Sequence, residues 1–298
     1  MRACSALLLL ASLAQAQPDT LPLLPVPVPP GPPPLVAPPP PPPPPGPFLP
    51  APLPPPTPDG FFANVELAIV LPRIEGKLAG PVGVPPAKLD AAVSPTFEIG
   101  YKPGGAEGGY FALALRFLDA SGGGDPRSRL SAMTFDLDYG QLPVEFAPRW
   151  TFGWRVGARI ADLSFDSRDG LGQRSRNEFY GGGVHGRADF ERRIVPVPGL
   201  SLFGRLDGAV VVGHVVQRYS VDGFTVWDRD SRAVPMVNAQ AGLSYVPPLL
   251  PALKVTAGYE YERWFKVGSL GLTATGTLAG SSGDVWWHGV FLRGQFDF

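Results

Sequence analysis

The chain has 298 residues, a formal net charge of −1 and 17% charged residues, fewer than the roughly 25% of a typical soluble domain. This charge balance gives no basic surface for nucleic acid, so we expect no nucleic-acid partner. Its apolar runs are shorter than the roughly 18 residues that a membrane-spanning helix needs, which excludes a helical membrane protein.

The first sixteen residues have the pattern of an export signal. Arg2 supplies the positive start, Ala6–Leu13 is a short apolar core, and Ala14, Gln15 and Ala16 fit an A-x-A cleavage site. Cys4, the single cysteine, precedes the apolar core, where a lipoprotein cysteine would follow it. We therefore predict a cleaved signal peptide over residues 1–16 and a mature chain without thiol chemistry.

Residues 17–59 form a proline-rich segment that includes an unbroken run at Pro38–Pro45. Proline fixes φ and has no amide donor, so the segment is predicted to be a disordered or polyproline II linker in the periplasm. A plain spacer is one interpretation. A tether that contacts the cell wall or a periplasmic partner is the other.

From Gly60 to Phe298 apolar and polar residues alternate with a period of two, which is the pattern of β-strands with two unlike faces. The clearest case places Trp150, Phe152 and Trp154 opposite Arg155 and Arg159. Ten such segments predict an all-β fold, a closed antiparallel transmembrane β-barrel of about ten strands over residues 60–298, with eight and twelve strands as alternatives.

The connections between these segments are expected to alternate in length, as in outer-membrane barrels with long external loops and short periplasmic turns. The long ones are Pro72–Ala92, Asp119–Ser128, Ser164–Asn177, Arg218–Arg232 and Lys266–Gly283, and the short ones are Pro103–Gly109, Gly140–Arg149, Glu191–Gly199 and Pro247–Ala252. This order predicts a protein of the outer membrane with its N- and C-termini in the periplasm. Aromatic residues near both ends of the apolar faces predict two interfacial belts.

The final segment alternates strictly and ends in Phe296, Asp297 and Phe298. It resembles the last strand of bacterial outer-membrane barrel proteins, which implies that Phe296 and Phe298 belong to the signal read by the barrel-assembly machinery. Outer-membrane lipid would be the other partner. Segments 135–139, 153–159 and 200–205 resemble the Legionella-type major outer membrane protein family, and this resemblance implies a pore.

Inward positions carry basic and acidic side chains in near balance. The basic ones are Arg116, Arg155, Arg159, Arg187, Arg205, Lys254 and Arg293; the acidic ones are Glu66, Glu98, Asp136, Asp138, Asp189, Asp207, Glu260 and Glu262. One interpretation is a small passive pore for ions or small polar solutes, lined by a ladder of Arg155, Arg159, Arg187 and Arg205. The alternative is a closed barrel whose charges pair across the lumen, serving as a structural anchor or an adhesion or interaction protein.

A lipid-modifying barrel enzyme is a minor alternative, because such enzymes use a Ser–His pair near one rim. His214 and His288 are predicted to point outward near the external rim, with Ser220, Ser281 and Ser282 in adjoining loops, and His185 to point inward. We expect no enzymatic activity. With no metal-ligand spacing and no phosphate-binding loop in the sequence, we also expect no metal and no cofactor.

Overall fold

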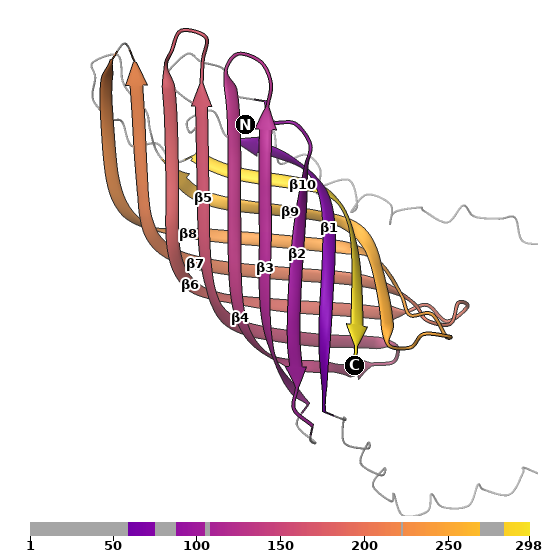
Figure 1. The fold of residues 1–298 in the computed structure, drawn as a ribbon. Coiled ribbons are helices and arrows are strands. Elements are labelled where there is room, and N and C mark those ends of the chain that lie inside the picture. The colour runs from indigo at the N-terminus through magenta and orange to yellow at the C-terminus, as the bar shows by residue number, and fades with distance from the viewer. Residues whose placement is uncertain (1–58, 75–87, 105–107, 222, 269–282) are drawn as a thin grey trace, which may run out of the picture. The chain divides into compact units, whose positions relative to one another are not determined.

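Ten antiparallel strands close into a single barrel in the computed structural model (Figure 1). The structure describes residues 59–74, 88–104, 108–221, 223–268 and 283–298. The predicted signal peptide and all but Asp59 of the predicted proline-rich linker lie outside these described residues. Each strand pairs with its sequence neighbours, and β1 pairs with β10 to complete the ring. The predicted all-β barrel and its count of ten strands are confirmed.

The strands differ in length, and the longest lie together in the middle of the chain. Their bounds are β1 (Gly60–Ile74), β2 (Ala92–Lys102), β3 (Gly109–Gly122), β4 (Arg127–Ala147), β5 (Trp150–Arg168), β6 (Arg174–Arg193), β7 (Leu200–Val221), β8 (Phe224–Tyr245), β9 (Leu253–Gly268) and β10 (Gly283–Asp297).

Alternation along each strand separates a lumenal face from an outer face. On β1, Asn64 and Glu66 are buried inside while Val65 and Leu67 are exposed outside. The outer face of the barrel is an apolar band of such exposed side chains, which in water would be costly and in lipid is favourable. The residues of β1 and β10 that the sequence predicts to face outward and inward are therefore the ones that do so in the structure.

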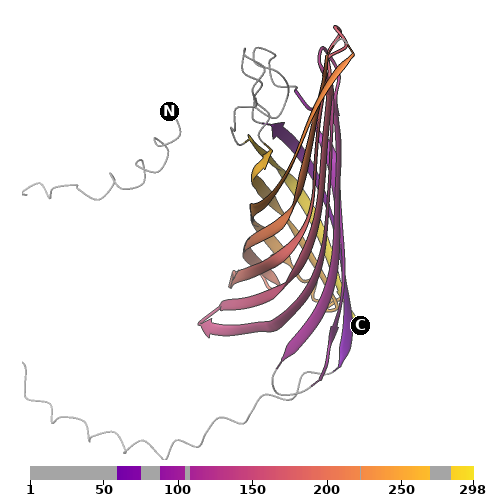
Figure 2. The same cartoon turned by 90° about the vertical axis from the view of Figure 1, so that its left-hand side faces the viewer.

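Two ends of the barrel are distinguished below. The terminal end is where β1 begins and β10 finishes, and the long-hairpin end carries the β3–β4, β5–β6 and β7–β8 hairpins (Figures 1 and 2). A row of neighbouring aromatics, Phe61, Tyr101, Phe111 and Tyr139, runs across β1 to β4 near the terminal end in direct register. Their rings are exposed on the outer face. They form part of the predicted belt.

Four predicted connections are corrected by the structure, because strand continues through most of each. β3 ends at Gly122 and β4 begins at Arg127; β5 and β6 are separated by residues 169–173 only; β7 ends at Val221 and β8 begins at Phe224; β4 runs on to Ala147. Most outer positions of the extensions at the long hairpins are polar or charged, with Trp227 as an exception, whereas the β4 extension exposes Val144 and Phe146. The apolar alternation that marks a lipid-facing strand is therefore incomplete in these extensions. The predicted connections Pro72–Ala92 and Lys266–Gly283 lie mostly outside the described residues.

Within the described ranges, no helix has the length and apolar character needed to cross a membrane.

Candidate functional site

The lumen is filled by side chains arranged in three layers along the barrel axis. An open polar cavity lies at the terminal end, a network of ion pairs occupies the middle, and an apolar layer lies toward the long-hairpin end. The order of these three layers along the axis decides what can pass through the barrel.

Strand register places most charges of the middle layer beside an opposite charge. Arg159 on β5 lies directly across from Asp136 on β4 and donates two hydrogen bonds to its carboxylate, at 2.7 and 2.8 Å. Planar guanidinium groups suit such bidentate contacts, which fix both side chains. Inward residues on adjacent strands thus become ion pairs by register alone.

The same register rule pairs three further arginines of the network. Arg187 lies opposite Asp207 with a contact of 3.1 Å, and the neighbouring Arg205 lies opposite Asp189 at 2.5 Å. Across the closing seam of the barrel, Arg293 donates from Nε to Glu66 at 2.8 Å.

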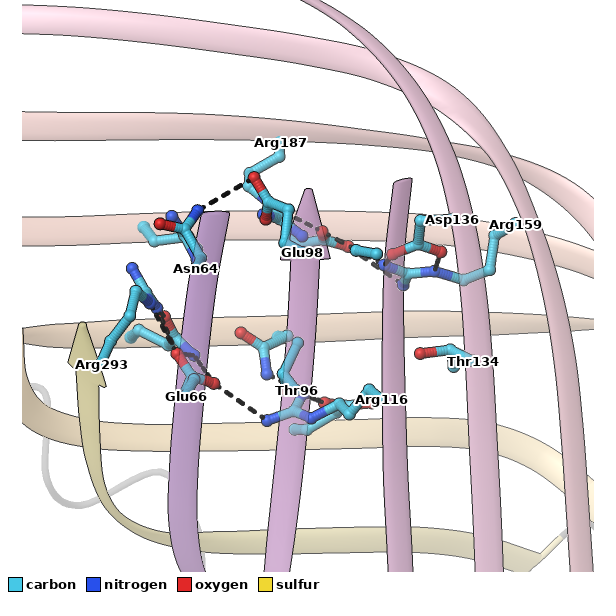
Figure 3. Close-up of a pocket in the computed structure, with 16 residues that line it drawn as sticks. Asn64, Glu66, Thr96, Glu98, Arg116, Thr134, Asp136, Arg159, Arg187 and Arg293 are labelled. Atoms are coloured by element: carbon cyan, nitrogen blue, oxygen red, sulfur yellow. Dashed lines mark hydrogen bonds and ion pairs between the residues drawn. The ribbon is translucent and has the colours of Figure 1, made fainter. Parts of the chain in front are cut away.

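Other contacts cross the lumen from one wall to the opposite wall. Arg116 on β3 reaches Glu260 on β9 at 2.5 Å and also pairs with Glu262 on the same strand and with Glu66 on β1. Arg155 on β5 reaches Glu98 on β2 at 3.0 Å. Bonds of this kind tie opposite walls together and close the middle of the barrel. Figure 3 shows other pairs of the network, among them Arg159 with Asp136 and Arg293 with Glu66.

Every inward-facing charged side chain of the middle layer that the structure describes has an opposite charge within 4.0 Å. Those side chains are Glu66, Glu98, Arg116, Asp136, Asp138, Arg155, Arg159, Arg187, Asp189, Arg205, Asp207, Glu260, Glu262 and Arg293. His185, which is charged only when protonated, lies beside Asp138 and Asp207. Burying an unpaired charge is unfavourable in free energy, so this pairing allows the charged side chains of the middle layer to lie together inside the barrel.

Among the described residues, two of the cavities adjoin the network of ion pairs. The central one, of about 50 Å³, is lined by the network residues, among them Glu66, Arg116 and Arg159. It has room for a few water molecules. A second cavity of about 330 Å³ lies toward the terminal end, lined by Phe62, Lys102 and Lys254 among others.

An apolar layer covers the network on the side of the long-hairpin end. All ten strands contribute a buried apolar side chain to it: Val70, Ala92, Leu118, Leu130, Phe165, Phe179, Val215, Met236, Trp264 and Trp287, each no more than 8% exposed. The indoles of Trp264 and Trp287 lie with their centroids 5.9 Å apart. This layer was not predicted from the sequence.

The fifteen charged residues that the sequence predicts at inward positions all point into the lumen or belong to its network. Lys254 pairs with Glu191 near the terminal end, and the others lie in the middle layer. Sequence reasoning missed Asn64, Asn238 and Gln240, whose amides hydrogen-bond to the acidic residues of the network. The sequence did contain a signal for them, because each alternates with the apolar, outward-facing residues of its strand. It also missed Lys102, which pairs with Asp297 at 2.6 Å.

The three histidines occupy unlike places. His185 is buried in the network beside Asp138 and Asp207, as its parity predicts. His214 is exposed and shares a hydrogen bond of 2.9 Å with Ser231, and His288 bonds to Tyr259. Among the described residues neither exposed histidine has a carboxylate partner to orient it, and Ser281 and Ser282 lie outside the described ranges. That the protein is not an enzyme stays a prediction.

One protein-family model, described as the Legionella pneumophila major outer membrane protein precursor, matches residues 138–298. The chain belongs to this family. Its match covers β5 to β10 and the end of β4, so it includes most arginines of the network. Family and closed barrel together make the chain an outer-membrane β-barrel protein, as the sequence indicated.

The solved structures that resemble this chain have low sequence identity to it. The outer membrane protease OmpT from Escherichia coli is 13% identical and has a TM-score of 0.51, over 81% of this chain and 98% of that chain. Neisserial surface protein A is 12% identical over 80% and 97%, with a TM-score of 0.33. A major outer membrane protein from Thermus thermophilus is 9% identical over 80% and 99%, with a TM-score of 0.39.

No curated protein sequence matches the chain. The likeness to OmpT shows the barrel architecture alone and assigns no chemistry to this lumen. What the lumen does is therefore argued from its own side chains.

Proposed function

We propose that this outer-membrane barrel is closed to solutes and serves as a membrane scaffold that presents its long hairpins at the cell surface. One observation carries the proposal: the described lumenal charges are paired across the middle of the barrel, beneath an apolar layer to which all ten strands contribute. This is the closed alternative considered from the sequence.

The two layers oppose ion passage in different ways. An ion entering the network must displace buried partners that are held by two or three contacts each, as Arg116 is. Breaking such buried pairs leaves uncompensated charges and costs about 3–5 kcal/mol. Beyond the network, the ion would lose most of its hydration among Trp264, Trp287 and Phe165, and the buried polar groups nearest to this layer, such as the amide of Asn177, carry no charge that could replace it.

The placement in the membrane is part of the proposal. We place the terminal end in the periplasm and the long-hairpin end outside, which puts both chain termini on the periplasmic side. The β3–β8 extensions support this placement, because outer-membrane barrels have short turns on the periplasmic side and longer connections outside. The extended hairpins would then be the external surface of the scaffold.

A small passive pore is the second candidate, and a specific observation favours it. The central and terminal-end cavities, of about 50 and 330 Å³, are both lined by charged residues: Arg205 lines both cavities, and Arg155 lines the terminal-end one. Rearrangement of the network would join them into a narrow polar path. Arg155, Arg159, Arg187 and Arg205 would then line it beside Glu98, Asp189 and Asp207.

Single-channel recording of the refolded protein in a planar bilayer separates the two candidates. We expect no stable conductance step from protein whose folded state is verified by heat-modifiable gel mobility. Stable ohmic steps would overturn the closed barrel and establish the pore. In that case, changing the four arginines to glutamine together should shift the preference toward cations, because the acidic partners remain.

A further inference from the structure

The outer face of β4 to β8 changes character toward the long-hairpin end. Below this level the face carries lipid-type residues such as Phe135, Ile160 and Val212. Above it the outward positions are rich in arginine, and we call this group the arginine belt: Arg127, Arg129, Arg168, Arg174, Arg176, Arg218 and Arg229.

Strand register gathers the belt into adjacent rows. Arg127 lies opposite Arg168, which lies opposite Arg174, and these three form one row across β4, β5 and β6. In the next row Arg176 lies opposite Arg218. Neighbouring strands are about 4.8 Å apart, so several guanidinium groups lie within reach of a single anionic headgroup.

Positive charge exceeds negative charge on this part of the outer face. Its seven arginines face four acidic residues, Asp119, Asp162, Asp166 and Glu178. Three arginines are paired: Arg129 with Asp119, Arg174 with Asp166 and Arg176 with Glu178. Arg127, Arg168, Arg218 and Arg229 are exposed and have no acidic partner within 4.0 Å among the described residues.

The belt begins where the lipid-facing surface ends. Tyr180, 59% exposed, marks the interfacial level on β6. On β5 the outward positions above Ile160 are Asp162, Ser164, Asp166 and Arg168. At about 3.3 Å per residue and a tilt near 40°, the rows from Ser164 to Arg168 lie about 10–20 Å beyond Ile160 along the membrane normal. The headgroup region adds about 5–8 Å to each side of the hydrocarbon core, and Tyr180 lies opposite Asp162, so the lower of these rows lie at headgroup depth and the row of Arg168 lies beyond it.

We propose that the arginine belt binds the phosphate groups of lipid headgroups in the leaflet at the long-hairpin end. Asp162, Ser164 and Glu178 lie between the apolar band and the arginines, so a lipid whose chains cover Ile160 and Val212 would reach the belt with the part of its headgroup that extends past them. Planar guanidinium groups bind phosphate through two parallel hydrogen bonds, which a lysine ammonium does not do. All seven cations of the belt are arginines. The proposal rests on the membrane placement proposed above.

Lipid A and its chemically dephosphorylated form are suitable probes for the refolded full chain in zwitterionic detergent. Bound lipid would be counted by native mass spectrometry across a titration, and folding verified by heat-modifiable mobility. The test variant changes the unpaired Arg127, Arg168 and Arg218 to glutamine. The matched control changes Arg149, Arg192 and Arg193, three exposed arginines at the terminal end, to glutamine.

Wild-type protein should bind lipid A, and bind it less tightly as salt rises. The belt variant should bind it roughly ten- to hundredfold more weakly, and the terminal-end control should bind like wild type. Equal binding by the belt variant, an equal loss in the control, or equal affinity for dephosphorylated lipid would each overturn the proposal. Since micelles have no sides and carry no current, these outcomes are independent of the orientation and conductance tests.

Discussion

Arg116 is the residue on which the closed lumen depends most directly. Its guanidinium pairs with Glu66, Glu260 and Glu262, and the latter two lie on the opposite wall of the barrel. Arg116→Met keeps the volume near constant and leaves three buried carboxylates without that partner. The free energy of unfolding should fall by about 3–5 kcal/mol, measured by urea titration of the refolded protein in lipid.

Arg129→Met is the matched control on the neighbouring strand. Arg129 pairs with Asp119 on the outer surface, where its side chain is 68% exposed and water screens the pair. This change should leave the urea midpoint where it is in the wild type. Equal midpoints for the two variants would contradict the idea that the lumenal network holds the barrel closed.

The alternation of residues along each strand was enough to predict which charges face the lumen. The register between adjacent strands then decides which of these charges pair. Once Arg159 and Asp136 are both inward on adjacent strands, their pairing depends only on where the hairpin turns. The contact of Arg116 with Glu260 is different, because it joins β3 to β9 across the lumen. Such a contact depends on barrel diameter and strand tilt, which no local pattern in the sequence records.

At the scale of elements, the seam between β1 and β10 is where the ring closes, and Gly289 lies on it. A Cβ at this position would overlap the backbone carbonyl oxygen of Ile69 on β1. Gly289→Ala should therefore hinder closure, lowering the fraction of protein that refolds to the heat-modifiable form. The measurement is gel mobility of unheated samples after refolding.

Gly294→Ala serves as its control on the same strand, because nothing lies within 4 Å of a Cβ there. The control should refold like the wild type. If Gly289→Ala refolds equally well, the seam tolerates a side chain and the register between β1 and β10 is looser than the structure has it.

The strands themselves show which elements a period-two pattern can find. Lipid-facing segments such as Gly60–Ile74 alternate apolar and polar residues, so they were predicted with the correct faces. The extensions of β5 to β8 were missed because both faces change there: Asp166 and Arg168 replace apolar residues outside, while a mixture of Phe165, Ser167 and Asn177 replaces charges inside. On the outer face apolar residues give way to charged ones, a reversal expected of a strand that leaves lipid for water.

This reversal also explains why the apolar layer was missed for the molecule as a whole. A porin-like expectation assigns polar residues to the lumen throughout, whereas here the lumen is polar in the middle and apolar toward the long-hairpin end. A barrel of ten strands is narrow enough for side chains such as Trp264 and Trp287 to meet inside. Where the strands project beyond the lipid, their inner face needs a core of its own.

The orientation of the whole barrel can be tested with two exposed leucines. Leu171 lies in the turn between β5 and β6 and is 79% exposed, while Leu249 lies in the turn between β8 and β9 and is 94% exposed. Each would be changed to cysteine in a Cys4→Ser background, which removes the single native cysteine. A membrane-impermeant maleimide added to intact cells should label Leu171→Cys and spare Leu249→Cys until the outer membrane is permeabilised. The reverse pattern would place the long hairpins in the periplasm. It would contradict a surface scaffold, because the charged strand extensions would then lie on the periplasmic side of the membrane.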